Sequence, residues 1–160
     1  MSKATNFFIL AGSLAACFLA GGIGSIFTSA AIPTWYASLT KPAFTPPNGV
    51  FGPVWSTLYL LMGISLFLVW RMGSSIPGVS IALAFFWSQL LLNTLWSISF
   101  FGLRSPLLGL LNIALLWGLI LITLILFLRV NRPAGLLLLP YLLWVSYASA
   151  LNLAIWKLNP

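Results

Sequence analysis

The chain of 160 residues contains no Asp, no Glu and no His. Most acid–base catalysis, metal binding and triad chemistry in proteins depends on carboxylates or imidazoles. Composition therefore excludes general acid–base pairs of these residues, paired-carboxylate glycosidase sites, His or carboxylate metal clusters and Ser-His-Asp triads. The single cysteine, Cys17, cannot form an internal disulfide. We accordingly expect no metal site and no cofactor.

Charge is scarce and has only one sign. Charged residues make up 4% of the chain and hydrophobic residues 61%, which is far outside the usual composition of a soluble domain. The seven cations are scattered over expected loops and ends, whereas a nucleic-acid surface needs a clustered basic stripe. We therefore expect no nucleic-acid partner and assign the cations to the interfaces of a lipid bilayer.

Apolar runs of about 20 residues, the length that a helix needs to cross a bilayer, occupy nearly the whole chain. They lack the alternating polarity of a transmembrane β-barrel. The sequence thus predicts one domain, residues 1–160, that is an all-α integral membrane protein with a five-transmembrane-helix bundle. The expected helices span about residues 6–27, 50–70, 79–101, 107–128 and 134–156, with one long loop at 28–49.

The charges leave the orientation in the membrane undecided. Five spans place four cations on one side and three on the other, which decides nothing by the positive-inside rule. The first group is Lys3, Arg71, Arg129 and Arg132, and the second is Lys41, Arg104 and Lys157. The membrane in which the protein resides is also open, although the lack of a visible transit peptide favours a bacterial one.

The first apolar run has two interpretations. The segment Leu14–Cys17 resembles a lipoprotein cleavage site, which would remove the first helix. However, the apolar run continues beyond Cys17, as a spanning helix requires. Small residues also recur every fourth position and suit close helix packing in lipid, at Gly12, Ala16, Ala20 and Gly24. These observations favour a membrane span, with Cys17 as a small packing residue.

The loop at 28–49 contains Trp35 and Tyr36, followed by three prolines in six residues, Pro42, Pro46 and Pro47. Proline density of this kind excludes a continuous helix and stiffens the segment. The aromatic residues fit a simple interfacial belt, and the whole segment equally fits a lid over a binding site.

Aromatic and amide residues of three expected helices fall in the half of the bilayer nearest this loop, by the rise of ~1.5 Å per residue. Within each helix they repeat every three, four or seven residues and share a face. They are Trp55 and Tyr59, then Gln89, Asn93 and Trp96, then Trp144, Ala148 and Leu151.

The buried amides among these residues allow two roles. Gln89 and Asn93 are costly in hydrocarbon, so they serve as contacts between helices or line a pocket. An aromatic-walled pocket with few polar points suits a large, flat, apolar ligand with acidic tails. Lys41, Arg104 and Lys157 lie on the same side, where they meet such carboxylates or extend to lipid headgroups.

Several motifs resemble the translocator protein family, also called tryptophan-rich sensory protein or peripheral-type benzodiazepine receptor, TspO/MBR. The similarity covers about four-fifths of the chain. Its residues are Trp35–Pro42, Thr45–Pro47, Pro53–Trp55, Leu58–Tyr59, Met62–Gly63, Gln89, Asn93, Trp96, Phe100–Gly102, Arg104, Pro140–Tyr141, Trp144, Ala148 and Leu151–Asn152.

The resemblance implies a five-helix bundle, often a homodimer, whose pocket beneath the first loop binds porphyrins, other tetrapyrroles and benzodiazepine-type ligands. It also implies a catalytic role for Trp55 and Trp144, because some bacterial members are reported to degrade protoporphyrin in light. The ligand contacts that it implies are Tyr36, Pro46, Pro47, Trp55, Tyr59, Asn93, Trp96, Ser97, Trp144, Ala148 and Leu151.

The chain departs from the family pattern at three places. Phe44 stands where many members have Trp, which keeps the ring and removes an N–H donor. Asn112 stands where we expect an acid in many relatives, so any role that depends on that charge is absent. Tyr147 and Lys157 are too far apart for the sterol motif attributed to animal members, so sterol binding is not supported.

Three functions remain. The first, which we favour, is a membrane protein that binds tetrapyrroles for transport, buffering or sensing. The second is an enzyme that degrades porphyrins, in which light and oxygen supply the reactivity and Trp55 and Trp144 donate electrons. The third is a membrane scaffold whose small-residue stripe on the first helix recruits partner helices.

Overall fold

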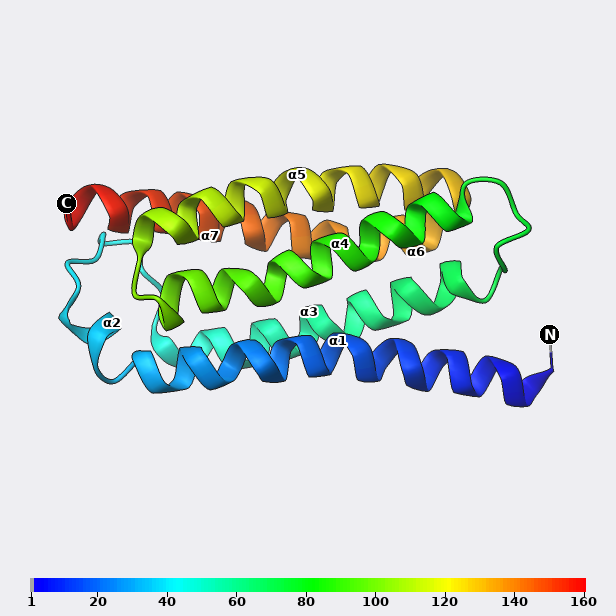
Figure 1. Cartoon of the computed structure of the whole chain (residues 1–160), viewed down its shortest axis with the longest axis horizontal. Helices are drawn as coiled ribbons and strands as arrows, with labels where there is room; N and C mark the ends of the chain where they lie inside the picture. Colours follow the sequence, from blue (N-terminus) through cyan, green and yellow to red (C-terminus); the bar gives the residue numbers. More distant parts are fainter. Residues whose placement is uncertain (1) are drawn as a thin grey trace.

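A computed structural model describes residues 2–160, and in this range five apolar helical spans run side by side along one axis (Figure 1). The N-terminus lies at one end of the bundle and the C-terminus at the other (Figure 1). The prediction of an all-α membrane bundle of five helices is confirmed. The spans are Lys3–Ala31, Asn48–Trp70, Val79–Gly102, Pro106–Val130 and Arg132–Leu158.

The predicted long loop is shorter than expected, because the helices on both sides extend into it. Helix α1 (Lys3–Ala31) is capped by Ser2, whose hydroxyl accepts the Thr5 N–H, and it ends two residues before Pro33. A single turn, α2 (Trp35–Ser38), follows within the predicted loop. Helix α3 (Asn48–Trp70) starts directly after Pro47. A proline favours this position because it has no N–H to donate within a helix.

The third span changes its winding near its end. Helix α4 (Val79–Ser97) continues into a π-helical turn, η1 (Ile98–Gly102). Such turns insert one residue into a helix and often occur at functional sites. Here the wider turn accompanies the burial of two consecutive rings, Phe100 and Phe101.

Helix α5 (Pro106–Val130) starts at Ser105, whose hydroxyl accepts the Leu108 N–H. The predicted fifth helix is divided near Leu138 into a short α6 (Arg132–Leu137) and a longer α7 (Leu139–Leu158). Asn131 caps α6 by accepting the Ala134 N–H, so the turn from α5 to α6 is tight.

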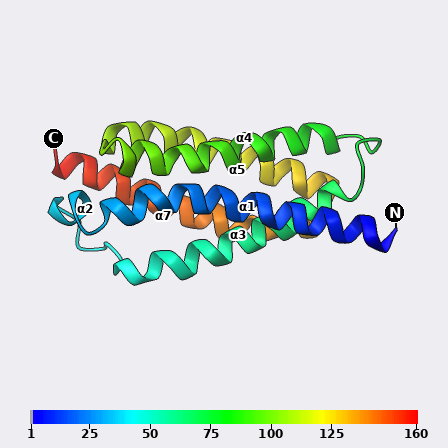
Figure 2. The same cartoon turned by 60° about the horizontal axis from the view of Figure 1, so that its bottom comes forward.

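The core lies along the bundle axis. Its largest fully buried apolar side chains include Met62, Leu66, Phe86 and Phe127, which come from α3, α4 and α5. Helix α1 packs mainly on α3 and α4, whereas α5 packs mainly on α4 and α7. In the view of Figure 2, α3 diverges from α1 toward the end that carries α2.

The small-residue stripe of α1 has a local partner in α4. The hydroxyl of Thr94 donates to the carbonyl oxygen of Ala20 at 3.3 Å, and a Cβ at Gly24 would lie 2.9 Å from the Ser97 Oγ. Gly12, by contrast, faces open space. The C-terminal part of the stripe therefore packs inside the bundle, where it brings α1 close to α4.

The tight turn between α5 and α6 yields a test of the packing. A Cβ at Gly135 would lie 2.6 Å from the backbone nitrogen of Leu128, which cannot move as a flexible side chain does. We expect Gly135→Ala to lower the free energy of unfolding by roughly 1–3 kcal/mol, measured by thermal unfolding in detergent. Gly118→Ala, which adds a methyl in open space on α5, serves as the control. Equal effects of the two substitutions would contradict this packing.

Candidate functional site

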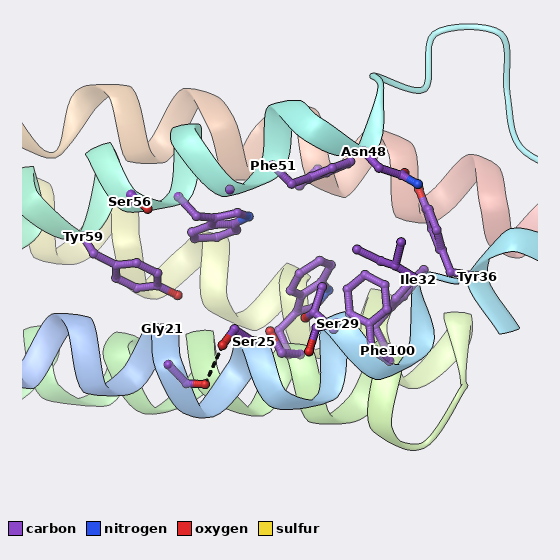
Figure 3. Close-up of a pocket in the computed structure, with 18 of the residues that line it drawn as sticks. Gly21, Ser25, Ser29, Ile32, Tyr36, Asn48, Phe51, Ser56, Tyr59 and Phe100 are labelled. Carbon is purple, nitrogen blue, oxygen red and sulfur yellow. Dashed lines mark hydrogen bonds between the residues drawn. The ribbon is translucent and has the colours of Figure 1, made fainter. Parts of the chain in front are cut away.

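A cavity of about 440 Å³ lies between α1, α3, η1 and α7, below α2. Figure 3 shows the Tyr59 side chain of α3 projecting toward α1. The volume is within the usual range for a small-molecule site. The lining includes aromatic residues and small residues but no Lys or Arg. The aromatic members are Phe18, Tyr36, Phe51, Trp55, Tyr59, Trp96, Phe100 and Phe101.

Two stacked ring pairs form the aromatic walls. Trp55 stacks on Tyr59 with ring centroids 5.6 Å apart and planes 27° from parallel. Trp96 stacks on Phe100 at the same centroid distance, with planes 22° from parallel. The first pair belongs to α3 and the second to α4 and η1, so the two pairs approach the cavity from different helices. Such faces are suited to stacking against a planar ligand.

Helix α1 provides a wall with almost no bulk. Gly21, Gly22, Ser25 and Ser29 all line the cavity. The Ser25 hydroxyl donates to the carbonyl oxygen of Gly22 at 2.7 Å (Figure 3), and the Ser29 hydroxyl donates to that of Ile26 at 3.4 Å. Because these hydroxyl hydrogens are already used within the helix, this wall offers mainly lone pairs to a ligand.

A chain of neutral hydrogen bonds lies behind the Trp55–Tyr59 wall. The Tyr59 hydroxyl donates to Asn93 Oδ1 at 2.6 Å, and Asn93 Nδ2 donates to the Tyr141 hydroxyl at 2.9 Å. The Tyr141 hydroxyl in turn donates to Gln89 Oε1 at 3.0 Å. This chain joins α3, α4 and α7, and it fixes the Tyr59 ring that faces the cavity. Within residues 2–160, Gln89 Nε2 has no hydrogen-bond partner.

A second amide fixes the other wall. The indole N–H of Trp96 donates to Asn152 Oδ1 at 3.2 Å, and Asn152 Nδ2 donates to the carbonyl oxygen of Pro106 at 2.8 Å. Asn152 therefore orients the Trp96 ring and ties it to the start of α5. Its own side chain also lines the cavity, which makes it one of the few polar points of the lining.

The end of the cavity near α2 is closed by Tyr36. Its ring is buried and contacts Phe101 with centroids 5.6 Å apart. Lys41 lies over the outer side of this ring, with Nζ 4.8 Å from the centroid, and donates to the carbonyl oxygens of Ala37 and Leu39. Burial raises the pKa of the Tyr36 phenol above its usual value, so the phenol stays neutral at physiological pH.

Seven of the eleven ligand contacts implied by the resemblance line this cavity. Two others, Pro46 and Pro47, lie in the connection that leads into α3. The remaining two, Asn93 and Trp144, are outside the lining, and Asn93 lies behind Tyr59 as a contact between helices. The seven that line the cavity are Tyr36, Trp55, Tyr59, Trp96, Ser97, Ala148 and Leu151.

Trp144 lies one ring away from the cavity. Its ring meets the edge of Phe51 at 6.1 Å and lies 5.5 Å from Tyr147. It lines a shallow apolar groove between α3 and α7 instead, and in the described part of the chain its indole N–H has no hydrogen-bond partner. Of the two tryptophans to which the resemblance gives a catalytic role, Trp55 lines the cavity and Trp144 lines the separate groove.

Sequence reasoning missed the α1 wall, as well as Phe51, Phe100 and Asn152. The glycines of α1 were interpreted only as surfaces for helix packing. Gly21 and Gly22 are adjacent, and Ser25 and Ser29 follow them at intervals of three and four residues, so small residues lie on more than one face of the helix. A single packing stripe needs small residues on one face only. That pattern was the available signal.

Chemically, the cavity offers stacking faces, a few hydroxyl and amide groups, and no side chain that ionises near neutral pH. It can bind an apolar planar molecule and exclude water from it, and any strong reactivity has to come from the ligand.

Gly21 gives a test of how the Tyr59 ring is positioned. A Cβ at Gly21 would overlap the Tyr59 ring. We expect Gly21→Ala to displace this ring, break its hydrogen bond to Asn93 and lower the free energy of unfolding by about 1 kcal/mol. Gly22→Ala, which adds the same methyl in open space, should have no such effect on thermal unfolding.

A double-mutant cycle identifies the cause of that loss. Tyr59→Phe removes the hydroxyl and should cost about 1 kcal/mol in the wild-type chain but almost nothing in the Gly21→Ala chain. Equal costs in the two chains would show that Gly21 does not act through this hydrogen bond.

Comparison with known proteins supports the resemblance found in the motifs. The profile of the TspO/MBR family matches residues 13–157. The chain is 46% identical over 151 residues to the tryptophan-rich protein TspO of Chlorobaculum tepidum, covering 94% of this chain and 96% of that protein. It is 47% identical over 154 residues to the tryptophan-rich protein TspO of Archaeoglobus fulgidus, covering 96% and 99%.

The similarity extends to animals. The human translocator protein is 38% identical over 153 residues, covering 95% of this chain and 88% of the human protein. A match of this length, together with five apolar spans in residues 2–160, identifies a multi-pass integral membrane protein. The chain belongs to the TspO/MBR family.

Proposed function

We propose that the protein binds porphyrins or related tetrapyrroles in the cavity between α1 and α3, for transport, buffering or sensing. The observation that carries the proposal is the pair of stacked aromatic walls, Trp55 with Tyr59 and Trp96 with Phe100, around a cavity of about 440 Å³. A porphyrin macrocycle is flat, aromatic and apolar, so its faces match these walls.

The polarity of the site agrees with such a ligand. The lining contains no Lys or Arg, which suits the apolar macrocycle. Lys41 lies over the Tyr36 ring rather than inside the cavity. Carboxylate tails directed toward α2 would approach this ammonium group, and the chain has no carboxylate of its own to compete for it.

Binding in darkness tests the proposal. Purified protein in nanodiscs is titrated with protoporphyrin IX, and quenching of tryptophan fluorescence is followed. We expect saturable binding, weakened about tenfold by Trp55→Ala, because the loss of one stacking face costs on the order of 1 kcal/mol or more.

Trp70→Ala is the matched control, since Trp70 lies at the opposite end of α3 and outside the cavity. Binding that is weakened equally by both substitutions would contradict this site. The absence of saturable binding by the wild-type protein would instead favour a scaffold role.

The same site allows a second function, the degradation of porphyrin in light and oxygen. The observation that favours it is the position of Trp55, an oxidisable side chain that lines the cavity directly. Loss of the pigment absorbance only under light and oxygen would support this function. Since Trp144 is not among the residues that line the cavity, we expect Trp55→Phe to slow the loss more than Trp144→Phe does.

A further inference from the structure

The connection between α2 and α3, residues 39–47, is held by the far end of the chain. It has no regular secondary structure. Figures 1 and 2 both place the C-terminal end of α7 at the same end of the bundle as α2. Among residues 2–160, three hydrogen bonds join this connection to distant segments, and all three involve α7 or the residue that follows it.

The first attachment is a pair of bonds between Asn159 and the backbone of Thr40. The Thr40 N–H donates to Asn159 Oδ1 at 3.0 Å, and Asn159 Nδ2 donates to the Thr40 carbonyl oxygen at 2.9 Å. The same Nδ2 donates to the carbonyl oxygen of Ile155 at 2.8 Å, at the end of α7. The amide is thus held by its own helix, and both of its ends bind one residue of the connection.

The second attachment lies four residues further along the connection. The Tyr147 hydroxyl donates to the carbonyl oxygen of Phe44, and the two rings meet with centroids 6.3 Å apart. Helix α7 therefore holds the connection on both sides of Lys41 and Pro42. The prolines between and after these points restrict the backbone, so the segment cannot easily bend between its attachments.

The attachments extend to the cavity through Lys41. This side chain follows Thr40 directly and lies over the ring of Tyr36, which closes the cavity near α2. Displacement of Thr40 would move Lys41 and remove its contacts with the carbonyl oxygens of Ala37 and Leu39. Asn159, which does not line the cavity, is thus linked through Thr40 and Lys41 to the outer side of the Tyr36 ring.

We propose that Asn159, together with Tyr147, is a positioning residue that latches the connection of residues 39–47 over the cavity and so limits how fast a ligand leaves. The identity of the ligand rests on the function proposed above, whereas the latch itself is a property of the unliganded protein. Asn159 acts through Thr40 and Lys41 and makes no contact with the ligand.

Hydrogen exchange in nanodiscs tests the latch without any ligand. Asn159→Leu keeps the size of the side chain and removes its hydrogen bonds. We expect the amide of Thr45, which donates to the Pro42 carbonyl oxygen and not to Asn159, to exchange about tenfold faster, because the connection opens more often once both bonds to Thr40 are lost.

The control is Asn131→Leu, which removes a capping amide at the opposite end of the bundle. It should lower global stability without accelerating exchange in the connection. Unchanged exchange at Thr45 in Asn159→Leu, or equal acceleration in both variants, would overturn the latch.

A second measurement connects the latch to the cavity. We expect protoporphyrin IX to dissociate from Asn159→Leu in darkness about tenfold faster than from the wild type, with Tyr147→Phe giving a smaller increase. A purely structural role would lower the melting temperature without this change in dissociation rate. Faster exchange combined with an unchanged dissociation rate would show that the ligand leaves by another route, which would overturn the proposal.

A thiol probe separates failure of the latch from failure of the proposed function. Ser97 lines the cavity, so Ser97→Cys in a Cys17→Ala chain reports access to the cavity by a small water-soluble methanethiosulfonate. We expect Asn159→Leu to accelerate labelling severalfold. If the wild type binds no porphyrin but labelling accelerates, the latch stands and the ligand assignment fails. Unchanged labelling overturns the latch whatever the protein binds.

Discussion

The buried polar side chains that are hydrogen-bonded in this bundle have neutral partners, because the chain has no carboxylate and hydrocarbon has no water to replace one. Among residues 2–160, Gln89 Nε2 and the Trp144 N–H are exceptions that have no partner. This constraint explains the chain of bonds from Tyr59 through Asn93 and Tyr141 to Gln89. Each group in it is an amide or a phenol that both donates and accepts. The members come from α3, α4 and α7. Their hydrogen bonds therefore also fix the relative positions of these helices, although α3 and α7 pack against each other only sparsely.

The cavity is a consequence of the same arrangement. The network and Asn152 anchor Tyr59 and Trp96, so the rings remain as walls and do not collapse into the space between α1 and α3. On the opposite side, α1 has only small residues at this level, and its close packing on α4 at Gly24 keeps it from filling the gap. Rigid aromatic walls and a backbone wall together give a site that exists before any ligand arrives.

The helices could be predicted from the sequence because a bilayer imposes length and polarity on each span. The seven predicted contacts that line the cavity came from the motifs of the resemblance, and a shared helix face also selected Trp55, Tyr59, Trp96, Ala148 and Leu151. The α1 wall was harder to predict, because Gly21, Gly22, Ser25 and Ser29 indicate small faces, whereas contacts with α3 and α4 decide which face meets the cavity. The break at Leu138 had a signal in Pro140, which lacks an N–H and lies in the first turn of α7.

The neutral network behind Tyr59 has an electrical consequence. Phenols, amides and indoles have no proton equilibrium near neutrality, and the lining of the cavity contains no Lys, Arg or Cys. The charge of the lining is therefore constant from mildly acidic to neutral solution. If the affinity for a ligand changes with pH in that interval, the change is caused by protonation of the ligand and not of the cavity lining.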